Sequence, residues 1–147
     1  MKHTCGVICV GENSLIRYLV GREPVLLDRD SLRAAMEQKI GAGIREFAVL
    51  MDEGGGLLAA ETALALKREH PGLRLTCLMR WEEQAASWPE PLRDRWFDAF
   101  AACDEELLVE PRRSTDNLKR CIDCLRERSS DWVVFCEPSA EGEETAP

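Results

Sequence analysis

Short apolar runs typical of β-strands alternate with amphipathic helical stretches along this chain, and this alternation restricts the fold more than any other feature. The predicted strands cover residues 4–10, 47–51, 73–79, 105–109 and 132–136. Helical periodicity fills the intervals between them. Strand–helix–strand units place successive strands parallel. We therefore expect an α/β fold, a Rossmann-like three-layer sandwich of about five mostly parallel strands with helices on both faces.

Some segments are less regular. Residues 15–20 fit either a helical turn or a short strand, residues 25–27 fit a short extended piece, and residues 82–87 are predicted to be helical. The length of 147 residues suits one domain. We place that domain at residues 1–137 and predict a disordered acidic tail over residues 138–147.

Three consecutive glycines, Gly54, Gly55 and Gly56, join a predicted strand to the helix that follows it. This order is usual in phosphate-binding sites, because glycine lets the backbone approach an anion and a helix N-terminus offers free N–H groups. Gly11 ends the first strand at the same edge of the sheet, where open α/β sheets bind ligands. We predict one crevice lined by these four glycines. The alternative is a set of tight turns with no ligand.

The net charge of −8 argues against general nucleic-acid binding, which needs a basic surface. No apolar stretch reaches the roughly 18 residues of a membrane span. The N-terminus does not resemble a secretory signal, so we expect a cytoplasmic protein.

The chain has seven cysteines, most of them in apolar runs, which is typical of free, buried thiols in a reducing compartment. Cys121 and Cys124 form a CxxC pair inside a predicted helix, whereas a redox pair needs its first thiol at a helix N-terminus. A zinc site would need two further ligands, for which Cys5 and Cys9 are the candidates. We favour structural thiols and expect no metal and no cofactor.

With this order of elements, the chain resembles the YpsA-like branch of the SLOG superfamily. These Rossmann-like domains are related to the DNA-processing protein DprA and to the "lonely guy" phosphoribohydrolases. The similarity covers about residues 4–138. Its pieces are, in order, Ala59-Ala60-Glu61, Leu66-Lys67, the run from His70 to Leu75, Gln84 with Trp88, Ala102-Cys103-Asp104, and Ser130-Asp131. The resemblance implies a nucleotide-derived ligand.

The chain departs from the family at the turn after the first strand. The family has a sequence resembling GHR there, whereas this chain has Gly11-Glu12-Asn13, without either basic side chain. The family's "RN" pair falls near residues 122–123. The family's glycine-rich loop and last strand–helix unit have no counterpart before the sequence ends at Pro147.

A second departure lies at the glycine junction. The family's turn resembles SGxxxGxD, and only its second glycine is matched, by Gly54, while Gly56 replaces its acidic residue. Asp52 and Glu53 stand directly before the glycines. Phosphate sites gain affinity from arginine and lysine, and carboxylates repel an anion. We therefore expect ligand binding that is weaker than in the family, altered, or absent.

Three further side chains are site candidates. An acidic residue on this helix serves catalysis in the phosphoribohydrolase relatives, which makes Glu61 a candidate. The alternative, a solvated or capping glutamate, is favoured because no partner arginine is evident. Gln84 and Trp88 lie four residues apart, so the amide would read a base edge while the indole stacks on the base. The alternative for Trp88 is packing against the edge of the sheet.

Three functions remain open. The first, which we favour, is a domain that binds a nucleotide-derived small molecule without catalysis. The second is a phosphoribohydrolase-type enzyme acting on nucleoside monophosphates through Glu61. The third is a structural or interaction module, forming a homodimer. The predicted ligand-binding residues are Gly11, Glu12, Asn13, Gly54, Gly55, Gly56, Gln84 and Trp88.

Overall fold

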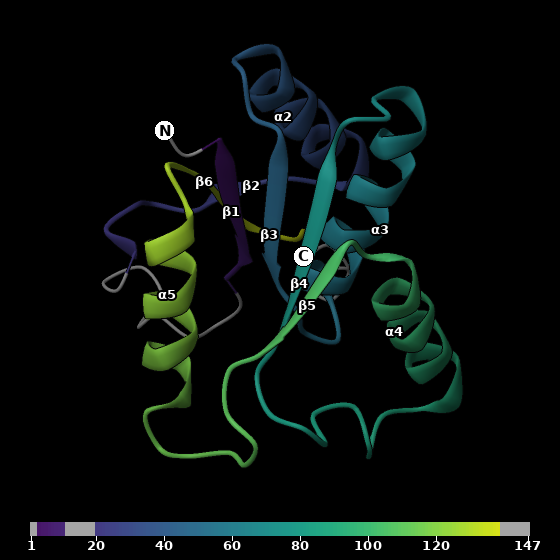
Figure 1. Ribbon diagram of the computed structural model, residues 1–147, viewed down its shortest axis with the longest axis vertical. Helices are drawn as coiled ribbons and strands as arrows, with labels where there is room; N and C mark the ends of the chain where they lie inside the picture. The colour runs from purple at the N-terminus through teal and green to yellow at the C-terminus, as the bar shows by residue number, and fades with distance from the viewer. Residues whose placement is uncertain (1–2, 11–19, 139–147) are drawn as a thin grey trace, which may run out of the picture.

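The computed structural model describes residues 3–10 and 20–138, and its centre is a sheet of six parallel strands. The strands lie in the order β2-β6-β1-β3-β4-β5 (Figure 1). Their bounds are β1 Thr4–Cys9, β2 Val25–Leu26, β3 Glu46–Leu50, β4 Arg74–Met79, β5 Glu105–Leu108 and β6 Asp131–Cys136. Because every strand runs in one direction, all their carboxyl ends meet at one edge, called the carboxyl edge below.

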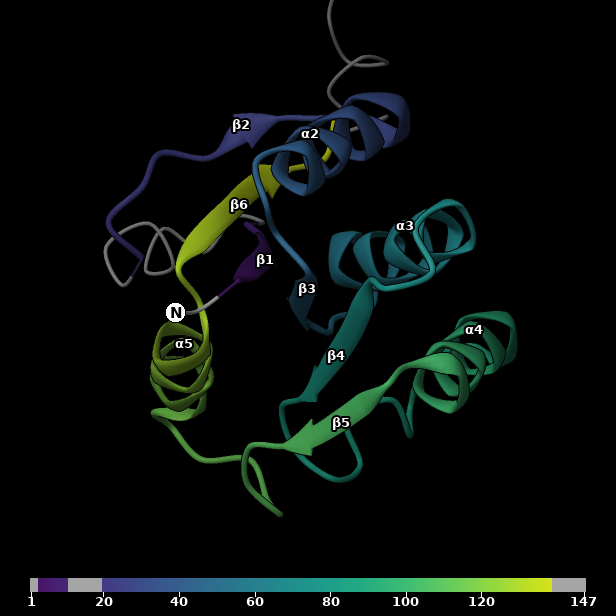
Figure 2. The same cartoon turned by 45° about the horizontal axis from the view of Figure 1, so that its top comes forward.

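Helices cover both faces of this sheet. Within the described residues they are α2 (Arg29–Gly41), α3 (Gly55–Glu69), α4 (Glu90–Ala102) and α5 (Asn117–Arg128). Figure 2 shows α2, α3 and α4 along one face and α5 on the other, and each face has its own buried apolar cluster. The predicted Rossmann-like three-layer sandwich is confirmed.

The apolar run of β3 explains how one strand serves both layers. Phe47 and Val49 are buried in the cluster under α2, α3 and α4, whereas Ala48 and Leu50 belong to the cluster under α5. Alternate side chains of a strand point to opposite faces of the sheet. An uninterrupted apolar sequence is therefore what a central parallel strand requires.

The connections diverge between β1 and β3. From β1 the chain passes to β2, beyond β6 on one side, whereas β3 leads through α3 to β4 on the other side. In open α/β sheets, ligands commonly bind at the carboxyl edge where the connections diverge in this way. The predicted glycine junction, Gly54, Gly55 and Gly56, lies directly after β3 at this point.

The structure adds one strand and removes one helix from the expected order. The short extended piece near residue 25 is β2, which pairs in parallel with β6 and is too short and exposed to show a period. The helix predicted over residues 82–87 is wrong, because this segment forms successive turns. In each turn a backbone N–H bonds the carbonyl three positions earlier, as Gln84 does to Trp81 and Ala86 does to Glu83. The side chain of Gln84 accepts from the N–H of Arg80 and donates to the carbonyl of Met51, and so holds these turns against the segment after β3.

Other expectations fall on segments with no description. Residues 15–19 and, apart from Pro138, the predicted tail lie outside the described residues. None of the helices in the described part of the chain has the length and apolar character needed to cross a membrane.

Candidate functional site

The glycine junction holds the carboxylate of Asp52 against the start of α3. Asp52 Oδ1 accepts hydrogen bonds from the backbone N–H groups of Gly54 and Gly56, each at 2.8 Å. These are amide groups that a bound phosphate would use at a helix N-terminus. The chain therefore supplies its own anion at the place where the sequence suggested a ligand phosphate.

Close packing explains two of the three glycines. A Cβ at Gly55 would overlap Cys9 Sγ at the end of β1 and lie 2.5 Å from Cys9 Cβ. A Cβ at Gly56 would overlap the carbonyl oxygen of Leu50 in β3. At Gly54 a Cβ would have only ordinary contacts, 3.5 Å from Glu137 Oε1 and 3.8 Å from Asp52 Oδ1. Gly55 and Gly56 thus let α3 begin directly against the sheet.

Several acidic groups lie around the glycine junction. Burial raises the pKa of Asp52 and the charge of Glu53 adds to the rise, while the N–H groups of Gly56 and Gly54 oppose it. Burial likewise raises the pKa of the Cys9 thiol to about 12, with further increases from Asp52 and from Glu137, which follows β6. Cys9 is therefore a protonated thiol at neutral pH and is a poor nucleophile.

We expect Asp52→Asn to be more stable than the wild type at neutral pH, because an amide oxygen accepts the same two bonds without burying a charge. A carboxyl whose pKa is raised by folding stabilises the folded state below that pKa and loses this contribution as pH rises through it. The advantage of Asp52→Asn should accordingly shrink as pH is lowered. Urea unfolding at a series of pH values measures it.

Asp52→Ala is the matched variant, since it removes the acceptor as well as the charge. We expect it to lower the free energy of unfolding by about 1 kcal/mol, as for the loss of a helix cap. Equal destabilisation by alanine and asparagine at neutral pH would contradict the capping role of Asp52.

The carboxylate of Glu61 pairs with an arginine, a partner that was not evident from the amino-acid sequence. Arg95 of α4 donates two hydrogen bonds to it, from Nε to Oε2 at 2.9 Å and from Nη2 to Oε1 at 2.6 Å. Such a two-pronged pair fixes the carboxylate in one orientation. Because the two residues lie 34 positions apart, only the packing of α3 on α4 brings them together.

Gln84 and Trp88 lie in the turns between β4 and α4. Gln84 is buried; its Oε1 accepts from the N–H of Arg80 and its Nε2 donates to the carbonyl of Met51, both at 2.8 Å. Trp88 meets Trp96 of α4 edge to face, with ring centroids 4.9 Å apart. The side-chain amide of Gln84 thus connects the segment after β4 to the end of β3. The predicted base-reading and stacking roles stay predictions.

The remaining predicted site residues, Gly11, Glu12 and Asn13, lie outside the described residues. All seven cysteines are described, and each is a free thiol. Burial raises the pKa of Cys121 to about 11 and also raises that of Cys124. Among the described residues no cluster of three or more His, Cys, Asp or Glu side chains is arranged to hold a metal ion.

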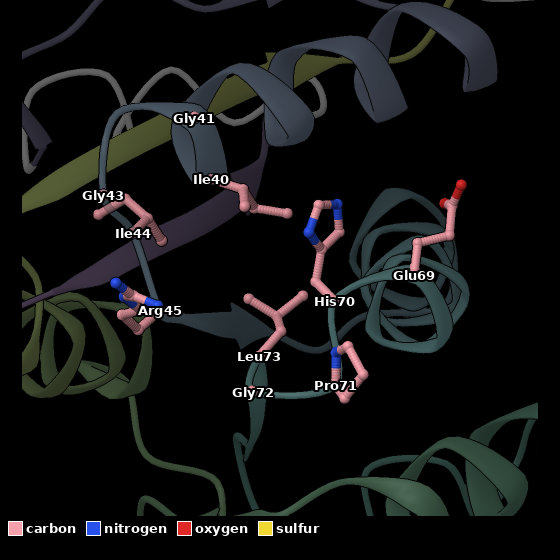
Figure 3. Close-up of a pocket in the computed structure, with 10 residues that line it drawn as sticks. All are labelled: Ile40, Gly41, Gly43, Ile44, Arg45, Glu69, His70, Pro71, Gly72 and Leu73. Atoms are coloured by element: carbon pink, nitrogen blue, oxygen red, sulfur yellow. The ribbon is translucent and has the colours of Figure 1, made fainter.

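A separate hollow of about 440 Å³ lies at the opposite edge of the sheet, between the ends of α2 and α3. Figure 3 shows Ile40, His70 and Leu73 facing one another across it. Glu69 at its rim pairs with Arg33. None of the predicted site residues that the structure describes lines this hollow, and it lies at the opposite edge of the sheet from the glycine junction.

No model of a known protein family matches this chain. Its relatives are UPF0398 proteins. It is 27% identical over 117 residues to UPF0398 protein BH1768 of Halalkalibacterium halodurans, covering 76% of this chain and 62% of that protein. It is 29% identical over 91 residues to UPF0398 protein YpsA of Bacillus subtilis, covering 60% and 51%.

A third relative, UPF0398 protein RBAM_020340 of Bacillus velezensis, is 24% identical over 116 residues, which are 78% of this chain and 64% of that protein. The chain thus spans between about half and two thirds of the length of these relatives. The resemblance to YpsA-like proteins is confirmed at this modest identity. The wider SLOG relationship stays a prediction.

Proposed function

We propose that this chain binds a nucleotide-derived small molecule in the crevice at the carboxyl edge, between the ends of β1 and β3, and does not break a bond in it. The observation that carries the proposal is the convergence of Asp52, Glu137 and the glycine junction at this divergence of the sheet. Ligands of open α/β sheets commonly occupy such a divergence.

The acidic crevice suits the hydroxyl groups of a ribose better than a phosphate. Both N–H bonds from Gly54 and Gly56 end on Asp52 Oδ1, and among the described residues no hydrogen bond is made to Oδ2, which is available to other donors. Carboxylates accept hydrogen bonds from sugar hydroxyls, as the acidic residue of dinucleotide-binding folds does. Phosphate would have to displace Asp52 from the start of α3 and approach Glu53.

We include no catalytic step in the proposal because of the contacts that Glu61 makes. A general acid or base must reach the atom whose proton it transfers. Both oxygens of Glu61 face the guanidinium of Arg95, at 2.6 and 2.9 Å, so the carboxylate is engaged between α3 and α4. The described part of the crevice also offers no activated thiol, because the pKa of Cys9 is raised to about 12.

A panel of nucleosides and nucleotides tested by thermal shift and calorimetry examines the proposal, with Gly54→Asp as the blocking variant. Aspartate is a favoured helix cap, so this variant should fold, but its carboxylate enters the crevice beside Glu137 and Asp52. We expect affinity for the bound member of the panel to fall by about tenfold or more, the equivalent of one lost hydrogen bond to a charged group.

Gly54→Ala is the matched control, since its methyl group makes only ordinary contacts. It should bind as the wild type does. If no member of the panel binds, or if Gly54→Asp binds as tightly as Gly54→Ala, ligand binding in this crevice is rejected.

A further inference from the structure

A second hollow at the carboxyl edge lies between the segments that follow β4 and β5. Its volume is about 520 Å³, and its lining consists of Trp81, Glu82, Glu83, Pro111, Arg112 and Arg113. The two segments lie at the foot of the molecule in Figure 1, and the N–H of Glu82 donates to the carbonyl of Pro111 at 3.2 Å. None of the predicted ligand-binding residues lines it.

Trp81 gathers two guanidinium groups at this hollow. The Cζ atoms of Arg80 and Arg113 each lie 5.2 Å from the centre of its ring system. The negative face of an indole attracts cations and offsets part of their mutual repulsion. Arg112 adjoins Arg113 and is exposed, so three positive charges gather along two short segments of an acidic chain.

The scaffold behind these charges is held by a buried asparagine. Asn117, at the start of α5, is 1% exposed; its Nδ2 donates to the carbonyl of Arg80, and its Oδ1 accepts from Arg80 Nε, both at 2.9 Å. Asn117 Nδ2 and Ser114 Oγ also donate to Glu110. These bonds join the segments after β4 and β5, so the walls of the hollow are positioned before any ligand arrives.

The guanidinium groups at this hollow are not paired with carboxylates in the described part of the chain. Within the described residues, no ion pair joins Arg80, Arg112 or Arg113 to a carboxylate, although Glu82 and Glu83 line the same hollow. A planar guanidinium matches the oxygens of a phosphate and binds them in a two-pronged manner. The charges of the two glutamates oppose an anion at this hollow, which favours ligands that carry several phosphate charges.

We propose that Arg112 and Arg113, supported by Trp81, bind the phosphate groups of a small phosphorylated ligand in this hollow. This inference rests on the proposed function in one respect, because it assigns the phosphate end of the nucleotide-derived ligand to the segment after β5. The start of α3 is not needed for that role, since Asp52 already occupies its N–H groups.

Calorimetric titration of the full chain with inorganic tripolyphosphate tests the inference without a base or sugar. We expect saturable binding to the wild type, and at least about a tenfold loss of affinity in Arg112→Gln/Arg113→Gln, which removes two charge-assisted contacts. Arg29→Gln/Arg68→Gln is the matched control, because it removes the same charge from exposed positions elsewhere. It should bind as the wild type does.

A further variant works in the opposite direction. Glu82→Gln/Glu83→Gln should bind tripolyphosphate more tightly, because it removes two carboxylates that line the hollow. No saturable binding, or equal weakening by the two arginine double variants, would overturn the inference.

The two proposals fail separately. Binding of an unphosphorylated nucleoside that is sensitive to Gly54→Asp, without binding of tripolyphosphate, would reject the phosphate site and leave the crevice. Tripolyphosphate binding that depends on Arg112 and Arg113, with silence across the nucleoside and nucleotide panel, would reject the crevice and leave the phosphate site.

Discussion

Gly56→Ala is expected to lower the free energy of unfolding by about 3 kcal/mol, the upper part of the usual range for overpacking a buried site. Helix propensity alone predicts the opposite sign, because alanine is favoured over glycine by about 1 kcal/mol inside a helix. The new Cβ would overlap the carbonyl oxygen of Leu50, and that atom belongs to the backbone of central strand β3. It cannot move without shifting the sheet.

Gly41→Ala is the control for this prediction. Gly41 is the last residue of α2, and a Cβ there would meet nothing within 4 Å, so the propensity term acts alone. We expect Gly41→Ala to be neutral or slightly stabilising. Urea unfolding of the two variants measures the difference, and a Gly56→Ala protein as stable as the wild type would show that α3 does not need to approach β3 this closely.

Gln84→Ala should cost about 2 to 3 kcal/mol, because it leaves one buried and one half-buried backbone group without a partner. The N–H of Arg80 and the carbonyl of Met51 both depend on the amide of Gln84, which is 8% exposed. Chemical denaturation measures the loss. Because Arg80 also contacts Trp81, the same variant should weaken the binding of tripolyphosphate.

Gln84→Glu and Ser87→Ala separate the causes. Glutamate keeps the acceptor for Arg80 but places a buried carboxylate oxygen against the carbonyl oxygen of Met51, so we expect a loss of stability at neutral pH at least as large as that of Gln84→Ala. Ser87 is exposed in the same connection, and its truncation should change little. If Gln84→Ala is as stable as Ser87→Ala, the amide does not hold this segment in place, and its conformation must depend on other contacts.

The amino edge of the sheet shows what the family resemblance could and could not reveal. Asp104 accepts from the N–H of Leu75 at 2.8 Å and pairs with Lys67, three positions that carried the resemblance. Asp131, another of them, pairs with Lys39 at 2.9 Å. Residues matched through their spacing thus hold strand starts at the edge opposite the crevice. Their spacing was visible in the sequence, but their structural role was not.

At the glycine junction, the presence of a carboxylate was easier to predict than the hydrogen bonds that it makes. The sequence placed Asp52 beside the glycines and predicted repulsion of an anion. The structure shows that its carboxylate already binds the N–H groups of Gly54 and Gly56. An aspartate two residues before a glycine is a known signal for a bond back to the backbone, and this signal was present in the sequence.

The layers and the parallel strands could be predicted from apolar periodicity and strand–helix alternation, because these are local properties that leave few topologies. Which side chains meet depends instead on tertiary packing. Glu61 finds Arg95, and Trp81 finds Arg113, through the packing of separate segments onto one sheet. The three glycines lie at the carboxyl edge of the sheet. The close approach of α3 to β1 and β3 accounts for Gly55 and Gly56 without a bound phosphate.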